Sequence, residues 1–287
     1  MLYWKPELAL GVLLPEQTET VDKWGGLPWG LPVERWPRCA SCGKPLSHLA
    51  TLTHDSERLD LKGGGRILMV FQCNHDPGGC DTWAAGSGAN AVLILEPGDI
   101  GSGLTHPPDA PNIGEATKVE PEARVLHWIV SDDGLTPEQA EACYNEDTFN
   151  ALPGNVLEGL GTDYAATKLG GPPFWVQFPE IPGPNVRFVG QFGMYHTFSG
   201  PAPRPEQIGC RVQRETTPGH YQIEKPLPNA PLVYSGIPFL TENIVPQGRE
   251  YLCQAADYGD AGTAYLFLSS PATPGELPTG KFLWQCG

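Results

Sequence analysis

The chain has 287 residues, of which 40% are hydrophobic, so it can bury the core of one large domain or of two ordinary ones. It carries 33 acidic against 18 basic residues, a net charge of −15, which disfavours direct binding to nucleic acid. The apolar run Leu8–Leu14 is too short for a signal peptide or a membrane span. We therefore expect a soluble, bacterial-type cytoplasmic protein with no membrane partner. Its eight cysteines would then be reduced thiols, metal ligands or core residues.

The expected elements are mostly short strands separated by turns, because 35 glycines and 31 prolines are spread along the chain. Apolar runs predict strands at 66–71, 91–95 and 125–130 in the first half, and residues 96–123 are expected to form a long surface loop. In the second half we expect strands at 186–192, 251–254, 264–269 and 281–285. The pattern indicates a β-rich α+β fold with few helices.

One helix is clearly predicted, and it begins at Thr136. Thr136 is a good N-cap, Pro137 suits the first helical position, and Gln139 can complete a capping box. Apolar side chains at 140, 142, 143 and 149 extend this helix to about Asn150. The stretch 154–161 follows, and we place a junction between two modules there.

A repeated pattern divides the chain into two related parts. Lys23-Trp24-Gly25-Gly26-Leu27-Pro28 returns 145 positions later as Lys168-Leu169-Gly170-Gly171-Pro172-Pro173, and similar apolar segments follow each copy. The repeat predicts two duplicated β-sheet modules, residues 1–160 and 161–287, with an insertion in the second near 194–248. The strand at 67–71 is expected to match the one at 264–267.

Four cysteines of the first module have the spacing of a zinc site. Cys39 and Cys42 form a C-x2-C-G turn, in which two thiolates can bind one ion, and Cys73 and Cys80 follow on a loop rich in turn-forming residues. His75 is a substitute ligand in this reading, and four buried free thiols are the alternative. Four protein ligands fill the coordination sphere, so a bound Zn²⁺ would be structural rather than catalytic.

Other candidate site residues carry weaker signals. Asp257 and Asp260 could bind a cation or act in acid–base chemistry, although such Asp-Gly sequences more often form turns between strands. The aromatic side chains that accompany the two Gly-Gly motifs either line a binding surface where the modules meet or belong to the core; they are Trp24, Trp29, Phe174 and Trp175.

The motifs resemble those of two known groups. Gly25-Gly26-Leu27-Pro28 and Cys39-x-x-Cys42-Gly43-Lys44-Pro45-Leu46, before a strand that ends at Cys73, are similar to the amino-terminal region of the eukaryotic programmed cell death 2 proteins and their yeast ribosome-assembly counterpart. The second half resembles the bacterial YwqG-like family; its matching motifs are Lys168-Leu169-Gly170-Gly171-x-Pro173, Phe188-x-Gly190-Gln191, Tyr258-Gly259-Asp260-Ala261-Gly262-x-Ala264-Tyr265-x-Phe267 and Trp284-Gln285-Cys286.

The resemblance implies a duplicated β-rich fold and a binding role, because the eukaryotic members are chaperones of a ribosomal protein and some bacterial members are suggested immunity proteins against toxins. We therefore expect an interaction protein that binds a basic protein partner on a zinc-stabilised scaffold, which the acidic composition favours. The alternative is a hydrolase-type enzyme with an acidic site between the modules.

Overall fold

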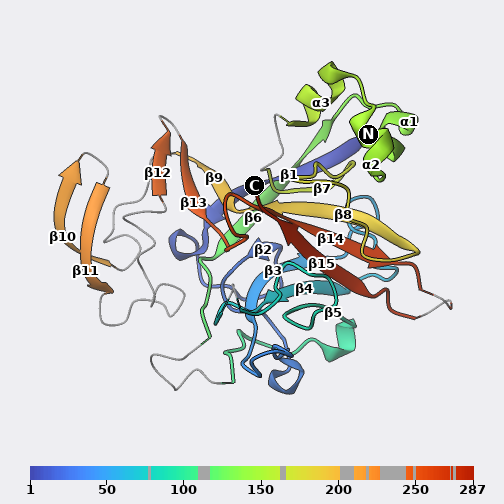
Figure 1. The fold of residues 1–287 in the computed structure, drawn as a ribbon. Coiled ribbons are helices and arrows are strands. Elements are labelled where there is room, and N and C mark those ends of the chain that lie inside the picture. Colours follow the sequence, from blue (N-terminus) through green and yellow to red (C-terminus); the bar gives the residue numbers. More distant parts are fainter. Residues whose placement is uncertain are drawn as a thin grey trace.

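The protein is built around one antiparallel sheet of ten strands (Figure 1). The computed structural model describes residues 1–76, 79–108, 117–161, 166–200, 210–217, 220–226, 244–247, 250–271, 273 and 276–287. The sheet order is β15-β14-β8-β7-β1-β6-β2-β3-β4-β5. The bounds are β1 Leu2–Leu10, β2 Lys23–Trp24, β3 Ser47–Thr53, β4 Ile67–Gln72, β5 Asn90–Leu95, β6 Ala123–Asp132, β7 Lys168–Gly170, β8 Val186–Gly193, β14 Thr263–Ser269 and β15 Gly280–Gln285.

The two halves of the sheet contain equivalent strands in the same order, counted inward from each outer edge. One half reads β5-β4-β3-β2-β6 and the other β15-β14-β8-β7-β1, and β1 pairs with β6 at the centre. The first strand of the chain therefore completes the half of the sheet that is otherwise formed by residues after 167. The predicted boundary near residue 160 stays a prediction, because a continuous sheet joins the two halves.

The register also corresponds between the halves. Lys23 pairs with Thr51 just as Lys168 pairs with Gln191, and the register shifts between His48 and Ala50 in one half and beside Gly190 in the other. These pairings place the end of β4 in one half of the sheet at the position equivalent to that of β14 in the other half. Both Gly-Gly motifs follow their strands with left-handed backbones, at φ 61° and 64° in the first and 78° and 60° in the second. Equivalent positions thus have equivalent geometry, which supports the predicted duplication.

The strands near the predicted insertion form two small sheets outside the ten-stranded one. β9 (Tyr195–Ser199), β12 (Ile244–Gln247) and β13 (Glu250–Gln254) make one, and β10 (Cys210–Thr217) and β11 (His220–Pro226) make the other. Figure 1 shows the pair β10–β11 at the margin of the molecule. Residues 201–209 and 227–243 of the predicted insertion lie outside the described residues.

The predicted capping box is confirmed, whereas the single long helix is wrong. The Thr136 hydroxyl oxygen accepts a hydrogen bond from the Gln139 amide, and Oε1 of Gln139 accepts one from the Thr136 amide. The helix breaks because Asn145 accepts hydrogen bonds from the amides at 147 and 148 and so caps a new helix. The α-helices are α1 Pro137–Ala142, α2 Glu146–Asn150 and α3 Gly154–Gly161, and the short 3-10 turns are Gly11–Leu13, Val33–Arg35 and Pro97–Asp99.

Within the described residues, three apolar clusters hold the sheet. The largest joins the two halves, because Trp24 of β2 packs edge-on against Phe192 of β8, with ring centroids 5.6 Å apart. A second cluster surrounds Trp36 and Phe71, and a third surrounds Trp175 and Tyr265. The outermost strands also touch, since a side chain at Gly280 of β15 would collide with Val92 of β5.

The prediction of a surface loop at 96–123 is wrong for its last part. Thr117, Glu120 and Glu122 are all buried, with exposed fractions of 6%, 2% and 6%. Residues 109–116 lie outside the described residues. Within the segment 117–122 these three side chains point into the protein, where the two carboxylates meet the polar groups described next.

Candidate metal centre and adjoining buried network

The four predicted cysteines come together. The sulfurs of Cys39, Cys42, Cys73 and Cys80 all lie within 4.8 Å of one another, and those of Cys42 and Cys73 are 3.7 Å apart. A tetrahedral ion with Zn–S distances of about 2.3 Å requires sulfurs about 3.8 Å apart. The donor set therefore fits a four-coordinate metal ion. Cys42 is exposed and the other three cysteines are buried.

The first two sulfurs are positioned by a tight turn. The Gly43 amide donates to the Cys39 carbonyl at 2.8 Å, and Gly43 adopts the left-handed φ of 73° that a residue with a side chain disfavours. Burial acts to raise the pKa of the Cys39 thiol, but the amides of Cys42 and Ser41 donate to its sulfur and the pKa is lowered overall. The turn thus directs N–H groups at a sulfur, as a metal-bound thiolate requires.

The second pair of sulfurs repeats this arrangement at the end of β4. The amides of His75 and Asp76 donate toward the sulfur of Cys73, although burial raises the pKa of this thiol to about 11. The Asp76 carbonyl then accepts from the Cys80 amide at 2.8 Å, which returns the chain to the cluster. Pro77 and Gly78, which we expected to make this turn, lie outside the described residues.

His75 is not part of the centre, so its prediction as a substitute ligand is wrong. Its Nε2 lies 3.2 Å from the Pro45 carbonyl oxygen and 3.3 Å from the Thr117 hydroxyl oxygen, and the group that could hold an ion consists of the four cysteines. Four sulfurs are enough for a tetrahedral ion, so an ion here would cross-link the turn at 39–43, the end of β4 and the loop between β4 and β5.

The loop between Cys73 and Cys80 also contacts a buried carboxylate. Asn74 donates to Oε1 of Glu120, and Lys118 lies 3.0 Å from Oε2 of the same group. Burial raises the pKa of Glu120; Lys118 and Asn74 oppose this shift and the charge of Asp257 adds to it. The metal centre is therefore linked to the second half of the chain, where Asp257 lies.

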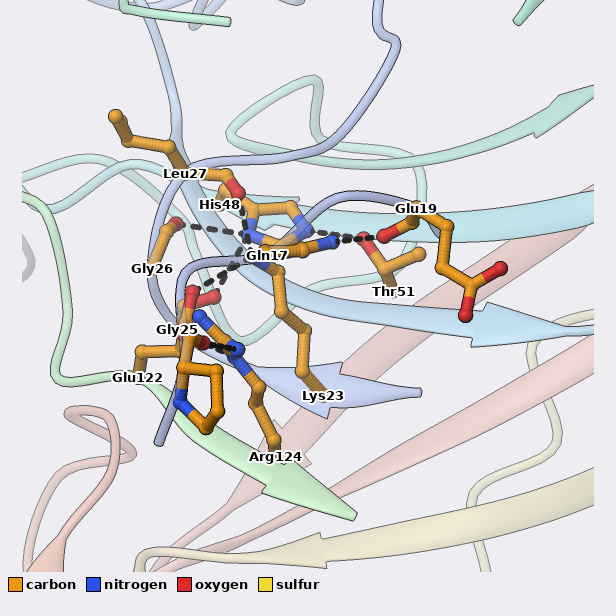
Figure 2. Close-up of polar contacts among 11 residues, drawn as sticks. Gln17, Glu19, Lys23, Gly25, Gly26, Leu27, His48, Thr51, Glu122 and Arg124 are labelled. Carbon is orange, nitrogen blue, oxygen red and sulfur yellow. Dashed lines mark hydrogen bonds and ion pairs between the residues drawn. The ribbon is translucent and has the colours of Figure 1, made fainter. Parts of the chain in front are cut away.

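A second network surrounds a buried lysine (Figure 2). The Lys23 ammonium donates to Gln17 Oε1 at 2.7 Å, to the Leu27 carbonyl at 2.6 Å and to Glu122 Oε2 at 2.7 Å. The other oxygen of Glu122 accepts from Arg124 at 2.6 Å. The Lys23 side chain is 0% exposed, and burial lowers its pKa although Glu122 acts against this shift. All three protons of the ammonium are thus satisfied inside the protein.

The Gly-Gly motifs have a packing role that explains their repetition. A side chain at Gly25 would collide with the Pro121 carbonyl, and one at Gly26 would collide with Glu122. The motif therefore lets the segment 117–122 approach the backbone closely. Lys168 bonds the Pro172 carbonyl at 2.8 Å just as Lys23 bonds Leu27, four positions ahead in each case. The ring of Tyr3, 5.2 Å from the Lys168 ammonium, takes the place that Glu122 has in the first half.

A buried histidine completes the network in Figure 2. His48 Nδ1 lies 3.0 Å from the Gly26 carbonyl and 3.2 Å from that of Gly25, while Nε2 lies 2.8 Å from the Thr51 hydroxyl oxygen. Since a carbonyl only accepts, Nδ1 carries the proton and Nε2 accepts from Thr51. Burial, together with the charge of Lys23, lowers the pKa of His48 to about 3, so its ring is neutral near pH 7. Burial lowers the pKa of His196 to about 3 as well.

The two buried histidines, His48 and His196, are expected to make the folded protein less stable in acid. The unfolded chain protonates them near pH 6.5 and the folded chain only near pH 3, so folding stability is full above pH 6.5 and is lost as the pH falls toward 3. Each group is expected to lower the free energy of unfolding by about 1.4 kcal/mol per pH unit in that window. Urea unfolding at pH 7, 6 and 5 measures the slope. His48→Gln should flatten it, while the exposed His127→Gln should not; equal slopes in all three proteins would refute this prediction.

The other predicted site residues have the following surroundings. Trp24 and Trp175 are each 2% exposed and lie in the core, and a binding role for them stays a prediction. Trp29 and Phe174 are half-buried. Asp257 accepts from the Gly259 amide at 3.1 Å, as in the predicted turn, and Asp260 is exposed. A shared site for the aromatics and the two aspartates therefore stays a prediction.

The buried polar groups have little local signal in the sequence. Glu120 and Glu122 were hidden in a segment whose Pro and Gly content indicates a surface loop, and nothing local marks them as interior. Lys23 did carry a signal, because a lysine opens both copies of the repeat.

No family model, curated protein or solved structure matches the chain. None of the helices in the described part of the chain is long and apolar enough to cross a membrane.

Proposed function

We propose that the cysteine cluster binds one structural Zn²⁺ and that the protein is a cytoplasmic interaction protein for a basic protein partner. The donor set supports the metal: four sulfurs at tetrahedral spacing, with amides directed at Cys39 and Cys73, are the ligands that structural zinc prefers. Zn²⁺ here would tie chain segments together, and the surrounding residues would hold it with no position left for substrate.

The partner follows from charge. A metal ion bound by four sulfurs would make the scaffold rigid. The net charge of −15 would attract cationic proteins and speed their association with it. The motif resemblance to the YwqG-like and programmed cell death 2 groups supports the same role, either chaperone-like or as immunity to a toxin. Membership of that superfamily is part of the proposal.

One observation favours the alternative, a hydrolase-type enzyme. Burial raises the pKa of Glu120, and the negative charge of Asp257 adds to this shift. Two carboxyl groups whose environments give them different pKa values are typical of acid–base sites. Against this reading, the Glu120 residue is 2% exposed and is bonded to Asn74 and Lys118, so it has the surroundings of a structural group. We therefore favour the binding role.

Co-purification tests the proposal. A tagged copy expressed in its host is expected to enrich a basic protein at low salt and to release it at high salt, because screening weakens attraction between exposed charges. A tagged protein of similar size and net charge is the control, and mass spectrometry identifies what is retained. If the tagged chain enriches no basic protein beyond that control at low salt, the proposed role is wrong.

A further inference from the structure

Cys42 differs from the other three cysteines of the cluster in its exposure to solvent. Cys42 is exposed, whereas Cys39, Cys73 and Cys80 are only 2%, 0% and 3% exposed. Oxidation of a cysteine follows its exposure and its thiolate character, and a sulfur that binds a metal ion is a thiolate. A dissolved oxidant therefore reaches the cluster first at Cys42.

A second sulfur lies close enough to react with the first. Sγ of Cys42 and Sγ of Cys73 are 3.7 Å apart, and a disulfide bond needs about 2.0 Å. Cys73 directly follows β4, and its amide donates to the Ala89 carbonyl at 2.8 Å, which fixes its backbone. Cys42 lies in a turn whose residues 40–43 are all exposed. The exposed turn is thus the side that can move to close the gap.

Building on the proposed metal site, we propose that Cys42 is a site of oxidation by peroxides and that it then forms a disulfide bond with Cys73. The Cys42 thiolate attacks one oxygen of hydrogen peroxide, the O–O bond breaks, and a hydroxide leaves a sulfenic acid on Cys42. The Cys73 thiolate attacks that sulfur, so that an S–S bond forms, the S–O bond breaks and a second hydroxide leaves. The two thiolates lose two electrons in total, and the peroxide gains two.

The disulfide bond also removes half of the ligands of the metal. Cys39 and Cys80 are the two sulfurs that remain, and structural zinc requires four protein ligands. Peroxide should therefore release the ion, and a thiol reductant should restore the site. The cluster would then respond to oxidants as well as stabilise the fold.

Oxidation should affect the segments of the centre unequally. The disulfide still joins the turn at 39–43 to the end of β4, whereas the loop that begins at Cys80 loses its attachment through sulfur. This loop carries Trp83, which is 42% exposed and packs on Trp284 with ring centroids 6.2 Å apart. We expect amide hydrogen exchange after oxidation to rise more in residues 79–84 than in the turn.

Hydrogen peroxide added to the zinc-loaded full chain tests the inference. A chelator that changes colour with zinc follows release of the ion, and alkylation of free thiols followed by mass spectrometry maps the disulfide. We expect release of the bound zinc, a bond between Cys42 and Cys73, and recovery of zinc binding after treatment with dithiothreitol and added zinc.

Two ligand exchanges separate exposure from the mere loss of a sulfur. Cys42→His keeps a nitrogen ligand for zinc but removes the exposed sulfur, so release by peroxide should be at least about tenfold slower. Cys80→His exchanges a buried sulfur in the same way and leaves both reacting cysteines, so release should stay near the parental rate. Cys286→Ser, outside the cluster, should also leave the rate unchanged. Elemental analysis verifies that each variant is loaded.

The outcomes distinguish this inference from the proposed function. If the parent protein holds zinc but peroxide does not release it, or if Cys42→His releases it as fast as the parent, the oxidation site is wrong and the metal centre stands. A disulfide bond between Cys39 and Cys42 overturns the assignment of Cys73. If the purified protein holds no zinc, the metal part of the proposed function fails, and the disulfide map of the parent alone decides whether Cys42 and Cys73 react.

Discussion

Loss of the proposed metal site is expected to destabilise the protein more than any other single change. Cys73→Ser removes one of four sulfurs and leaves the ends of β4, the turn at 39–43 and the loop before β5 without their cross-link. We expect the free energy of unfolding to fall by about 4 kcal/mol or more, because losing a structural metal is among the few changes of that size. Elemental analysis should find one zinc per chain in the parent protein and almost none in the variant.

Cys286→Ser is the matched control, because Cys286 lies outside the cluster and is only half-buried. It should keep full zinc content and lose little stability in urea. Prolonged dialysis against a strong chelator should bring the parent protein to the stability of Cys73→Ser. Equal stability of the two serine variants, or a parent protein that contains no metal when purified without added metal, would rule out the centre.

The sequence predicted features that depend on local spacing. The C-x2-C-G turn brings Cys39 and Cys42 together within four residues, and the capping box at Thr136 acts within one helical turn, so neither depends on the rest of the fold. The repeat also predicted equivalent strands, because homologous segments carry the same alternation of apolar side chains. The pairing of β2 with β3 and of β7 with β8 agrees with that expectation.

Features that depend on distant contacts could not be predicted in this way. Lys23 and Glu122 are 99 positions apart, and only the folded sheet places them in contact. Composition favoured a surface loop for residues 96–123 because Pro and Gly are frequent in turns, but it carries no information on which turn is covered by other segments. The position of β1 between β6 and β7 is likewise decided by pairing across the whole chain.

The second large effect is expected at the buried ion pair. Glu122→Gln keeps the shape of the side chain but leaves the Lys23 ammonium buried without an anion, while Lys23→Met leaves Glu122 with Arg124 alone. Each change should lower the free energy of unfolding by about 3–5 kcal/mol, because removing one partner strands the other charge away from water. Denaturant unfolding, followed by tryptophan fluorescence, measures both.

The double variant shows whether the cost comes from the stranded charge. With Lys23→Met and Glu122→Gln combined, neither member of the pair is left as a buried charge, and Arg124, which is 15% exposed, keeps its bond to the Pro15 carbonyl, so we expect about 1–3 kcal/mol of the summed loss to be recovered. Arg35→Gln breaks the exposed pair with Asp99, whose side chains are 38% and 52% exposed, and should cost less than about 1 kcal/mol. Strictly additive losses in the double variant would show that Lys23 and Glu122 act by packing alone. Recovery would instead show that the attraction between Lys23 and Glu122 holds the segment 117–122 against the Gly-Gly turn.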